Sequence, residues 1–363
     1  MRLRTVPAVG ETLLAAVLLV AALIAAMEIL LAVRGIRPTA VDDEPTWVLQ
    51  RYRAAALGPQ ALILIGASRI QTDIDIDALR DATHLEPVQL AIDGNSFVPI
   101  LKGLADDTAV NGTILVSYGA SALLATDGKD QASRYELAYE SDRDRLNSVD
   151  FSSAEYRLDG LVRSRLRAFA DGARPITSLT ARIMTSTPSP QYSIFLLDRS
   201  RLADYANLDA TEAYYTRVLR ELGGNLTIPA GADLRSVDVD IRARIAASPE
   251  IPEQPYQEGL DRVAAYVHKI EARGGRVAFV DFPTNGLITE MEDHACPRER
   301  CWERFVAATP SATHLSFHDV AYLRTFPVPD GSHIDFRNRR QLTLALVQLL
   351  KLNEPNPINA SPR

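Results

Sequence analysis

The sequence Ala-Leu-Ile-Leu-Ile-Gly-Ala-Ser-Arg at residues 61–69 is an apolar run that ends in a turn of small residues carrying a serine. A short apolar run bounded by turn residues is typical of a buried strand. Similar runs follow at 88–92 and 113–117, and helical patterns at 76–83 and 98–105 fit between them. Strands that alternate with helices indicate βαβ units and a mostly parallel sheet.

This alternation stops after the third predicted strand. Residues 120–255 are polar and rich in Arg, Asp and Tyr, and we expect a long, largely helical insertion there. The pattern resumes with a helix at 256–273 and a strand at 276–281, followed by a candidate fifth strand at 314–320 and a closing helix at 337–352. The sequence therefore predicts an α/β fold with helices on both sides of the sheet.

The predicted elements divide the chain into four parts. We expect residues 1–37 to hold a cytoplasmic N-terminus and a membrane anchor, 38–60 a linker, 61–352 the α/β domain with its insertion, and 353–363 a loose tail. The formal net charge of −7 makes the chain acidic. Nucleic-acid binding needs a basic surface, so the composition argues against a nucleic-acid partner.

The N-terminal segment Thr12–Val33 is almost entirely apolar, apart from Glu28. About 20 apolar residues span a bilayer as a helix, whereas the apolar region of a signal peptide is about 7 to 15 residues long. Glu28 also falls where a cleavage site would stand. We expect a retained anchor, with a cleaved signal peptide as the alternative. Arg2, Arg4 and the terminal amine precede the segment, and Arg34 and Arg37 follow it, so the basic residues alone do not decide its orientation. We expect a cytoplasmic N-terminus and an extracytoplasmic body.

The two cysteines, Cys296 and Cys301, are a candidate disulfide in an oxidising compartment. Together with His314 and His318 they also fit the C-x4-C-x12-H-x3-H spacing of a zinc finger. Pro310, however, stands where the helix of a finger would run. We therefore expect a small disulfide loop and no metal.

A late Asp330-Gly331-Ser332-His333 motif complements the early serine, Ser68. A serine hydroxyl is a poor nucleophile until a base removes its proton, and that base must be held in the correct tautomer. Ligand sites in open α/β sheets gather beyond the carboxyl ends of the strands. We therefore expect Ser68 as nucleophile, His333 as base and Asp330 as the group that orients it.

The same Asp-x-x-His spacing occurs earlier in the chain, at Asp81 and His84. That copy precedes the second predicted strand, and we expect it to be a solvated helix end. The tyrosines of the insertion are candidates for stacking on sugars or for packing in a partial core; they are Tyr205, Tyr214 and Tyr215.

Over residues 61–118 and 275–350 the chain resembles the SGNH hydrolase superfamily. The similarity is to its membrane-anchored branch, which is linked to acylation of bacterial polysaccharides and cell walls and includes alginate O-acetylation proteins. The segment Gly66-Ala67-Ser68-Arg69 corresponds to the first family block, Gly94 to the second, and Asp330 with His333 to the last. The resemblance implies a flavodoxin-like sheet and no cofactor.

The third family block has no counterpart in this chain. The family has Gly-x-Asn-Asp there, with an asparagine that donates to the oxyanion, whereas residues 117–121 read Ser-Tyr-Gly-Ala-Ser. The resemblance then implies an oxyanion site made of the backbone amides of Ser68 and Gly94, with Asn95 as a substitute donor. Arg69 is expected to bind substrate or to lock the turn.

The expected function is that of an extracytoplasmic serine O-acyl esterase or acyltransferase, acting with acetyl groups on a cell-envelope or exported polysaccharide. The resemblance implies a multipass membrane acyltransferase as a partner. The unmatched third block favours the alternative, a non-catalytic relative that binds polysaccharide or scaffolds an assembly complex.

Overall fold

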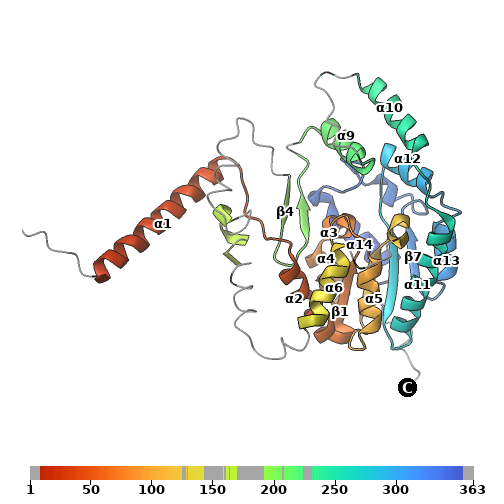
Figure 1. Cartoon of the computed structure of the whole chain (residues 1–363), viewed down its shortest axis with the longest axis horizontal. Helices are drawn as coiled ribbons and strands as arrows, with labels where there is room; N and C mark the ends of the chain where they lie inside the picture. The colour runs from red at the N-terminus through yellow and green to blue at the C-terminus, as the bar shows by residue number, and fades with distance from the viewer. Residues whose placement is uncertain are drawn as a thin grey trace, which may run out of the picture. The chain divides into compact units, whose positions relative to one another are not determined.

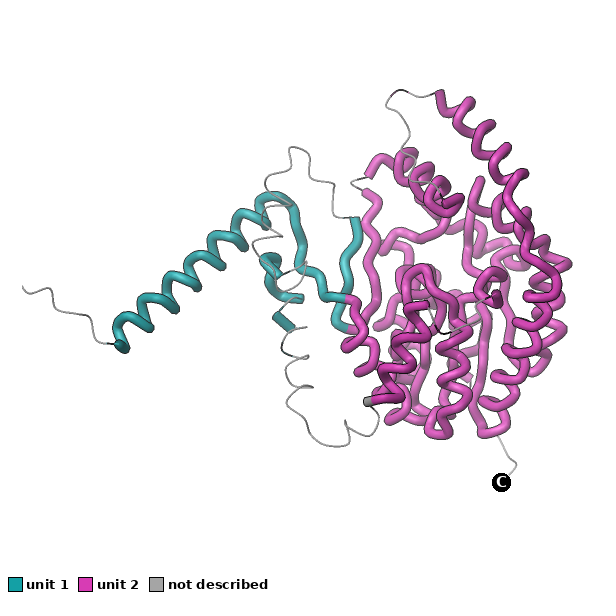
Figure 2. The backbone as a smooth tube through the Cα atoms, in the orientation of Figure 1, with its two compact units in different colours: residues 1–41, 151–197 teal, residues 42–150, 198–363 magenta. Residues whose placement is uncertain are grey.

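A computed structural model describes residues 9–124, 128, 130–142, 158, 161–162, 164–169, 192–206, 208–223, 231 and 233–354. The chain forms two compact units, which Figure 2 distinguishes by colour. Unit 1 comprises residues 1–41 and 151–197, and unit 2 comprises residues 42–150 and 198–363. The long insertion is therefore shared between the two units.

Unit 2 is built on a parallel sheet of five strands in the order β2-β1-β3-β6-β7. Figure 1 labels two of these strands, β1 and β7. The strands are β1 (Ala61–Ile65), β2 (Glu86–Gln89), β3 (Thr113–Ser117), β6 (Arg276–Asp281) and β7 (Thr313–Ser316). The predicted mostly parallel α/β architecture is confirmed, and β1, β3 and β6 have the predicted bounds.

The strands of unit 2 bury both faces because their side chains alternate. Ile63 and Ile65 point into one core, and Leu62 and Leu64 into the other. The first core is covered by α2 (Glu44–Leu57), α5 (Val98–Asp106), α6 (Gln131–Asp142), α11 (Glu253–Glu271) and α13 (Trp302–Ala308). The second is covered by α3 (Ser68–Asp73), α4 (Ile76–Thr83) and α14 (Phe336–Leu349).

Two strands end earlier than the sequence predicts. The predicted strand 88–92 is β2, which ends at Gln89. Beyond it, the Arg199 side chain donates to the carbonyls of Gln89, at 2.7 Å, and Ala91, at 3.1 Å. These carbonyls therefore face a guanidinium instead of another strand. The predicted strand 314–320 is β7, which ends at Ser316, where the Asp319 amide bonds back to the Ser316 carbonyl and turns the chain.

The part of the insertion that belongs to unit 2 contains, besides α6, β5 (Arg201–Ala203), α9 (Ala210–Glu221) and α10 (Leu234–Ala247). Its helices α9 and α10 pack against α12 (Gly286–Ala295). Buried side chains of α9 and α10 form a small core with Leu287 and Ile288 of α12. The expected linker 38–60 also contributes to unit 2, since α2 buries Trp47 and Ala54 in the main core.

Unit 1 contains α1 (Val9–Val33), which is long and apolar enough to span a membrane. Glu28, the one acidic residue late in this helix, accepts a hydrogen bond from the Ala168 amide at 2.7 Å and pairs with Arg167 at 3.3 Å. Arg167 and Ala168 belong to η3 (Arg167–Phe169), and unit 1 also holds β4 (Ser193–Phe195). Arg2 and Arg4 lie outside the described residues, and so does the expected tail apart from residues 353 and 354.

Candidate active site

The structure brings Ser68, His333 and Asp330 into one hydrogen-bonded relay. Ser68 is the first residue of α3, just past the carboxyl end of β1, and the other two lie in the loop before α14. The Ser68 hydroxyl lies 2.8 Å from His333 Nε2, and His333 Nδ1 lies 2.8 Å from Asp330 Oδ2. This is the geometry that a serine nucleophile, a base and an orienting carboxylate require.

The turn that carries the nucleophile depends on Gly66. Its φ of +143° lies in a region that residues with a Cβ rarely adopt, and a Cβ added there would lie 2.6 Å from the Cβ of Ser117. Glycine therefore allows β1 to turn sharply against β3 and to start α3 at Ser68. The same turn directs the serine toward the loop that holds the histidine.

The charges around the relay favour a neutral imidazole beside an ionised carboxylate. Burial lowers the pKa of His333, while the hydrogen bond and charge of Asp330 act in the opposite direction. Burial alone would raise the pKa of Asp330, but its bonds to His333 and to the Ser332 amide outweigh that effect and lower it. A neutral His333 can accept the serine proton at neutral pH.

A cavity of about 590 Å³ opens in front of Ser68. Its lining combines the nucleophile turn and the loop at Gly94 and Asn95 with residues of the insertion, among them Arg217 and Arg220 of α9. These two arginines are not recognisable as site residues from the sequence, because no motif in the insertion indicates which of its many charged residues line the cavity.

The side chain of Asn95, in the loop after β2, has partners in its own loop and in α6. Gly94 lines the cavity with a φ of +67°, and no atom lies within 4 Å of where its Cβ would be. The Asn95 side chain donates to the Asp93 carbonyl at 2.9 Å, and its oxygen accepts from the amides of Gln131 and Ala132. Asn95 thus holds the start of α6, and it also lines the cavity.

Arg69 joins the two halves of the relay. Its Nε donates to the Ser332 hydroxyl at 3.1 Å, and its Nη2 forms an ion pair with Glu292 of α12. Ser332 directly precedes His333, so Arg69 connects the turn that carries the nucleophile to the loop that carries the base. Of the two expected roles, this geometry supports locking the turn, although Arg69 also lines the cavity.

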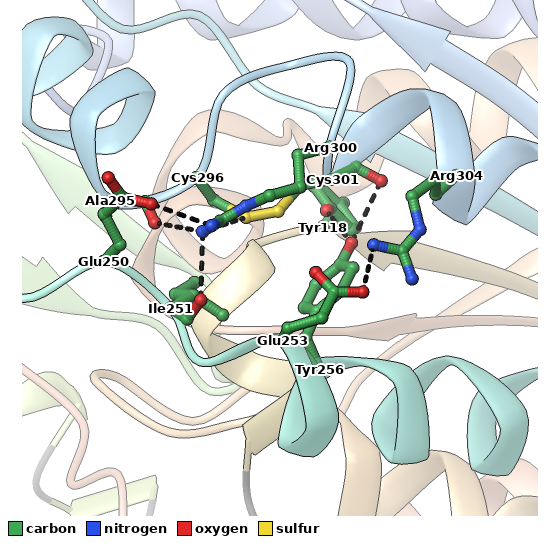
Figure 3. The surroundings of a disulfide bond; sticks show 10 residues. All are labelled: Tyr118, Glu250, Ile251, Glu253, Tyr256, Ala295, Cys296, Arg300, Cys301 and Arg304. Atoms are coloured by element: carbon green, nitrogen blue, oxygen red, sulfur yellow. Dashed lines mark hydrogen bonds and ion pairs between the residues drawn. A yellow bond between two sulfur atoms is a disulfide. The ribbon is translucent and has the colours of Figure 1, made fainter.

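The segment at residues 117–121, which follows β3, lies beside the disulfide. Ser117, Tyr118 and Gly119 line the main cavity, and the hydroxyl of Tyr118 lies 2.9 Å from that of Tyr256, which donates to the Cys301 carbonyl (Figure 3). Cys301 is bonded to Cys296 in the predicted disulfide. A second cavity of about 130 Å³ adjoins this bond and shares Arg69 and Tyr118 with the main cavity.

The zinc interpretation of the cysteines is wrong for this structure. Cys296 and Cys301 are oxidised to a disulfide, and metal binding needs thiolates. His314 is stacked on Phe279, with its Nε2 2.8 Å from the Thr309 hydroxyl. Its pKa is lowered to about 4 by burial, as is typical of a core histidine.

The early Asp-x-x-His copy lies at the exposed end of α4. His84 ends this helix in a left-handed conformation, with a φ of 58°, and both Asp81 and His84 are exposed. This is the solvated helix end that the sequence predicts. Of the candidate tyrosines, Tyr205 reaches the relay, whereas Tyr215 bonds to Asp238 of α10.

No protein-family model matches this chain, and no curated protein matches its sequence.

Proposed function

We propose that this protein is a serine O-acyl esterase or acyltransferase of the SGNH type. The relay from Ser68 through His333 to Asp330, at the edge of a cavity of about 590 Å³, is the observation that supports this activity most directly. The strand order β2-β1-β3-β6-β7 also supports it, since flavodoxin-like sheets follow the order 2-1-3-4-5 when strands are numbered within the sheet.

In this proposal His333 Nε2 takes the proton of Ser68 as the hydroxyl oxygen attacks the acyl carbonyl. The backbone amides of Ser68 and Gly94 donate to the oxyanion that forms, and one such donor is worth about 3 kcal/mol in the transition state. His333 then returns the proton to the departing alcohol as the ester bond breaks. The serine is left carrying the acyl group, and Asp330 stabilises the transient imidazolium throughout.

The second half of the reaction decides between hydrolysis and transfer. His333 deprotonates either water or a sugar hydroxyl, that oxygen attacks the acyl-serine, and the Ser68 hydroxyl is regenerated with the proton from His333. The open cavity, whose lining includes the charged side chains of Arg217 and Arg220, suits a sugar polymer better than a buried apolar ligand. We propose a cell-envelope or exported polysaccharide as substrate, which loses acetyl groups in hydrolysis or gains them in transfer. For transfer, we propose a multipass membrane acyltransferase as the source of acyl groups.

We infer that the protein is anchored by α1 with unit 2 outside the cytoplasm. The apolar α1 and the disulfide between Cys296 and Cys301 support this placement, because disulfides persist mainly in oxidising compartments. A C-terminal alkaline phosphatase fusion tests it, since this reporter folds only after export. An inactive fusion on an intact, membrane-bound chain would place unit 2 in the cytoplasm.

The catalytic proposal is tested with the full-length protein in detergent micelles and p-nitrophenyl acetate as the probe. We expect Ser68→Ala and His333→Ala each to lower kcat/KM by about 10³-fold or more. His84→Ala is the matched control, because it removes the histidine of the early Asp-x-x-His copy, and it should leave the rate unchanged. Equal rates in all four proteins would contradict an acyl-serine mechanism.

A non-catalytic role in polysaccharide binding or assembly is the second candidate. The specific observation in its favour is the segment Ser117–Gly119, which lines the cavity without the amide side chain that the family places there. This candidate predicts that acetylated polysaccharide binds equally well to the wild type and to Ser68→Ala, and that neither protein releases acetate.

A further inference from the structure

The carboxylate of Asp330 is held by more than its histidine. Oδ1 accepts the backbone amides of Ser332 and His333, at 2.9 and 2.7 Å. Oδ2 accepts from His333 Nδ1, and it also accepts from the phenol of Tyr205 at 2.8 Å. A carboxylate offers about four lone-pair positions, so these bonds use its accepting capacity and fix its orientation.

Tyr205 is itself fixed in place. It follows β5, in the insertion, and its backbone amide donates to Oδ2 of Asp335, the residue that caps α14, at 2.9 Å. The neighbouring Asp204 pairs with Arg337 of the same helix at 2.9 Å. The Tyr205 side chain is buried, with 7% of its surface exposed. Two connections to α14 therefore place the phenol before any substrate binds.

We propose that Tyr205 is a positioning residue of the acyl-transfer site, acting on His333 through Asp330. This inference rests on the proposed function. The phenol shares the negative charge of Oδ2, so the carboxylate attracts the imidazolium less strongly, and it holds the plane of the carboxylate against Nδ1. The insertion thus completes the catalytic relay, besides shaping the cavity in front of it.

Removing the phenol of Tyr205 leaves the other charged groups near His333 in the protein. Arg69 of α3 and Arg217 of α9 both act against protonation of His333. Asp73 of α3 accepts the Ile334 amide at 3.0 Å, and burial raises its pKa well above the ordinary value. Asp335 is neutralised by Arg337 at 2.8 Å. A change in the titration of His333 on removing the phenol would therefore report on Asp330.

The test compares Tyr205→Phe with the wild type in pH profiles of p-nitrophenyl acetate hydrolysis by the full-length protein. Without the phenol, Asp330 should hold the imidazolium more tightly. We expect the acidic limb of kcat/KM to move to higher pH and kcat to fall about 10-fold, with KM unchanged. Tyr215→Phe is the matched control, because it removes a phenol that donates to Asp238, away from the relay.

A second substitution reverses the expected shift. Replacing Tyr205 by 3-fluorotyrosine, by amber suppression, makes the phenol a stronger donor and should move the acidic limb to lower pH. This variant keeps the hydroxyl, so it remains informative if Tyr205→Phe does not fold.

The outcomes separate this inference from the proposed function. An active wild type whose profile is unchanged by the fluorinated residue, and by Tyr205→Phe when that variant folds, would overturn the role of Tyr205 and leave the activity intact. A wild type no faster than Ser68→Ala would refute the proposed function itself. Opposite shifts for the two variants would support the inference.

Discussion

Arg69 Nε donates to the hydroxyl of Ser332 at 3.1 Å, and this bond ties the first turn of α3 to the loop before α14. Ser68 and His333 are the chain neighbours of these two residues, so the bond fixes the distance between nucleophile and base. Because the attacking geometry is sensitive to shifts of about 1 Å, the clamp is expected to affect chemistry more than binding.

Substituting Arg69 should therefore lower kcat more than it raises KM. We expect Arg69→Gln to lose the ion pair with Glu292 and to reduce kcat by about 100-fold. Steady-state kinetics with p-nitrophenyl acetate measures this, with Arg80→Gln, on the exposed surface of α4, as the control. A rise in KM alone would instead assign Arg69 to substrate binding.

Gly66 should not tolerate a side chain. Its Cβ would overlap Ser117 and its φ is unfavourable for other residues, so Gly66→Ala should destabilise the fold by about 1–3 kcal/mol. Gly119→Ala is the matched control, because a Cβ there meets no atom within 4 Å. Urea unfolding followed by circular dichroism compares the two, and equal midpoints would contradict the steric argument.

The hydrolysis rate should stay high below the pH at which an ordinary histidine becomes protonated. Burial lowers the pKa of His333 below its usual 6.5, so the base remains neutral in mildly acidic solution. The acidic limb of kcat/KM, measured in constant ionic strength buffers, should then have its midpoint below pH 6.5. A midpoint above that value would show that Asp330 dominates over burial.

Stability should decline between acidic and neutral pH because of Glu136. Burial raises the pKa of this α6 carboxyl from 4.5 to about 7, although Arg51 opposes the shift. In that interval the folded state binds more protons than the unfolded state, so the free energy of unfolding falls as pH rises. Glu136→Gln should flatten this slope in urea titrations at several pH values, and an unchanged slope would exclude Glu136 as its source.

The disulfide should contribute to stability more than to catalysis. It closes a loop of only a few residues, for which chain entropy predicts about 2 kcal/mol. We expect the double variant Cys296→Ser, Cys301→Ser to unfold at lower urea and to keep its esterase rate. A large loss of activity without a loss of stability would indicate that the adjoining cavity of about 130 Å³ takes part in the reaction.

The sheet was predictable because the local sequence of each central strand already identifies it as a strand. A strand buried on both faces reads as an unbroken apolar run, so residues 61–65 and 113–117 have the same bounds in sequence and structure. The relay was predictable for a related reason, since Ser68 closely follows β1 and His333 lies in the loop between the last strand and the closing helix. Its assembly across 265 positions still required the parallel topology to bring both to one edge.

The insertion was less predictable because its residues are placed by tertiary contacts. Nothing in the local sequence distinguishes Tyr205, which reaches Asp330, from Tyr215, which reaches Asp238. The same holds for Asn95, whose partners Gln131 and Ala132 lie in a helix that the sequence analysis did not predict. Side chains in polar segments are fixed by distant partners, and a single sequence does not show those pairings.

Arg199 covers part of the outer edge of the sheet, where β2 has no further neighbouring strand among the described residues. An outer strand normally offers a row of carbonyls that can recruit a strand from another copy and begin aggregation. Here the guanidinium of Arg199 donates hydrogen bonds to the carbonyls of Gln89 and Ala91. Pro87, within β2, has no amide hydrogen that could bond to another strand. We therefore expect this edge of the sheet to resist pairing with a strand of another copy.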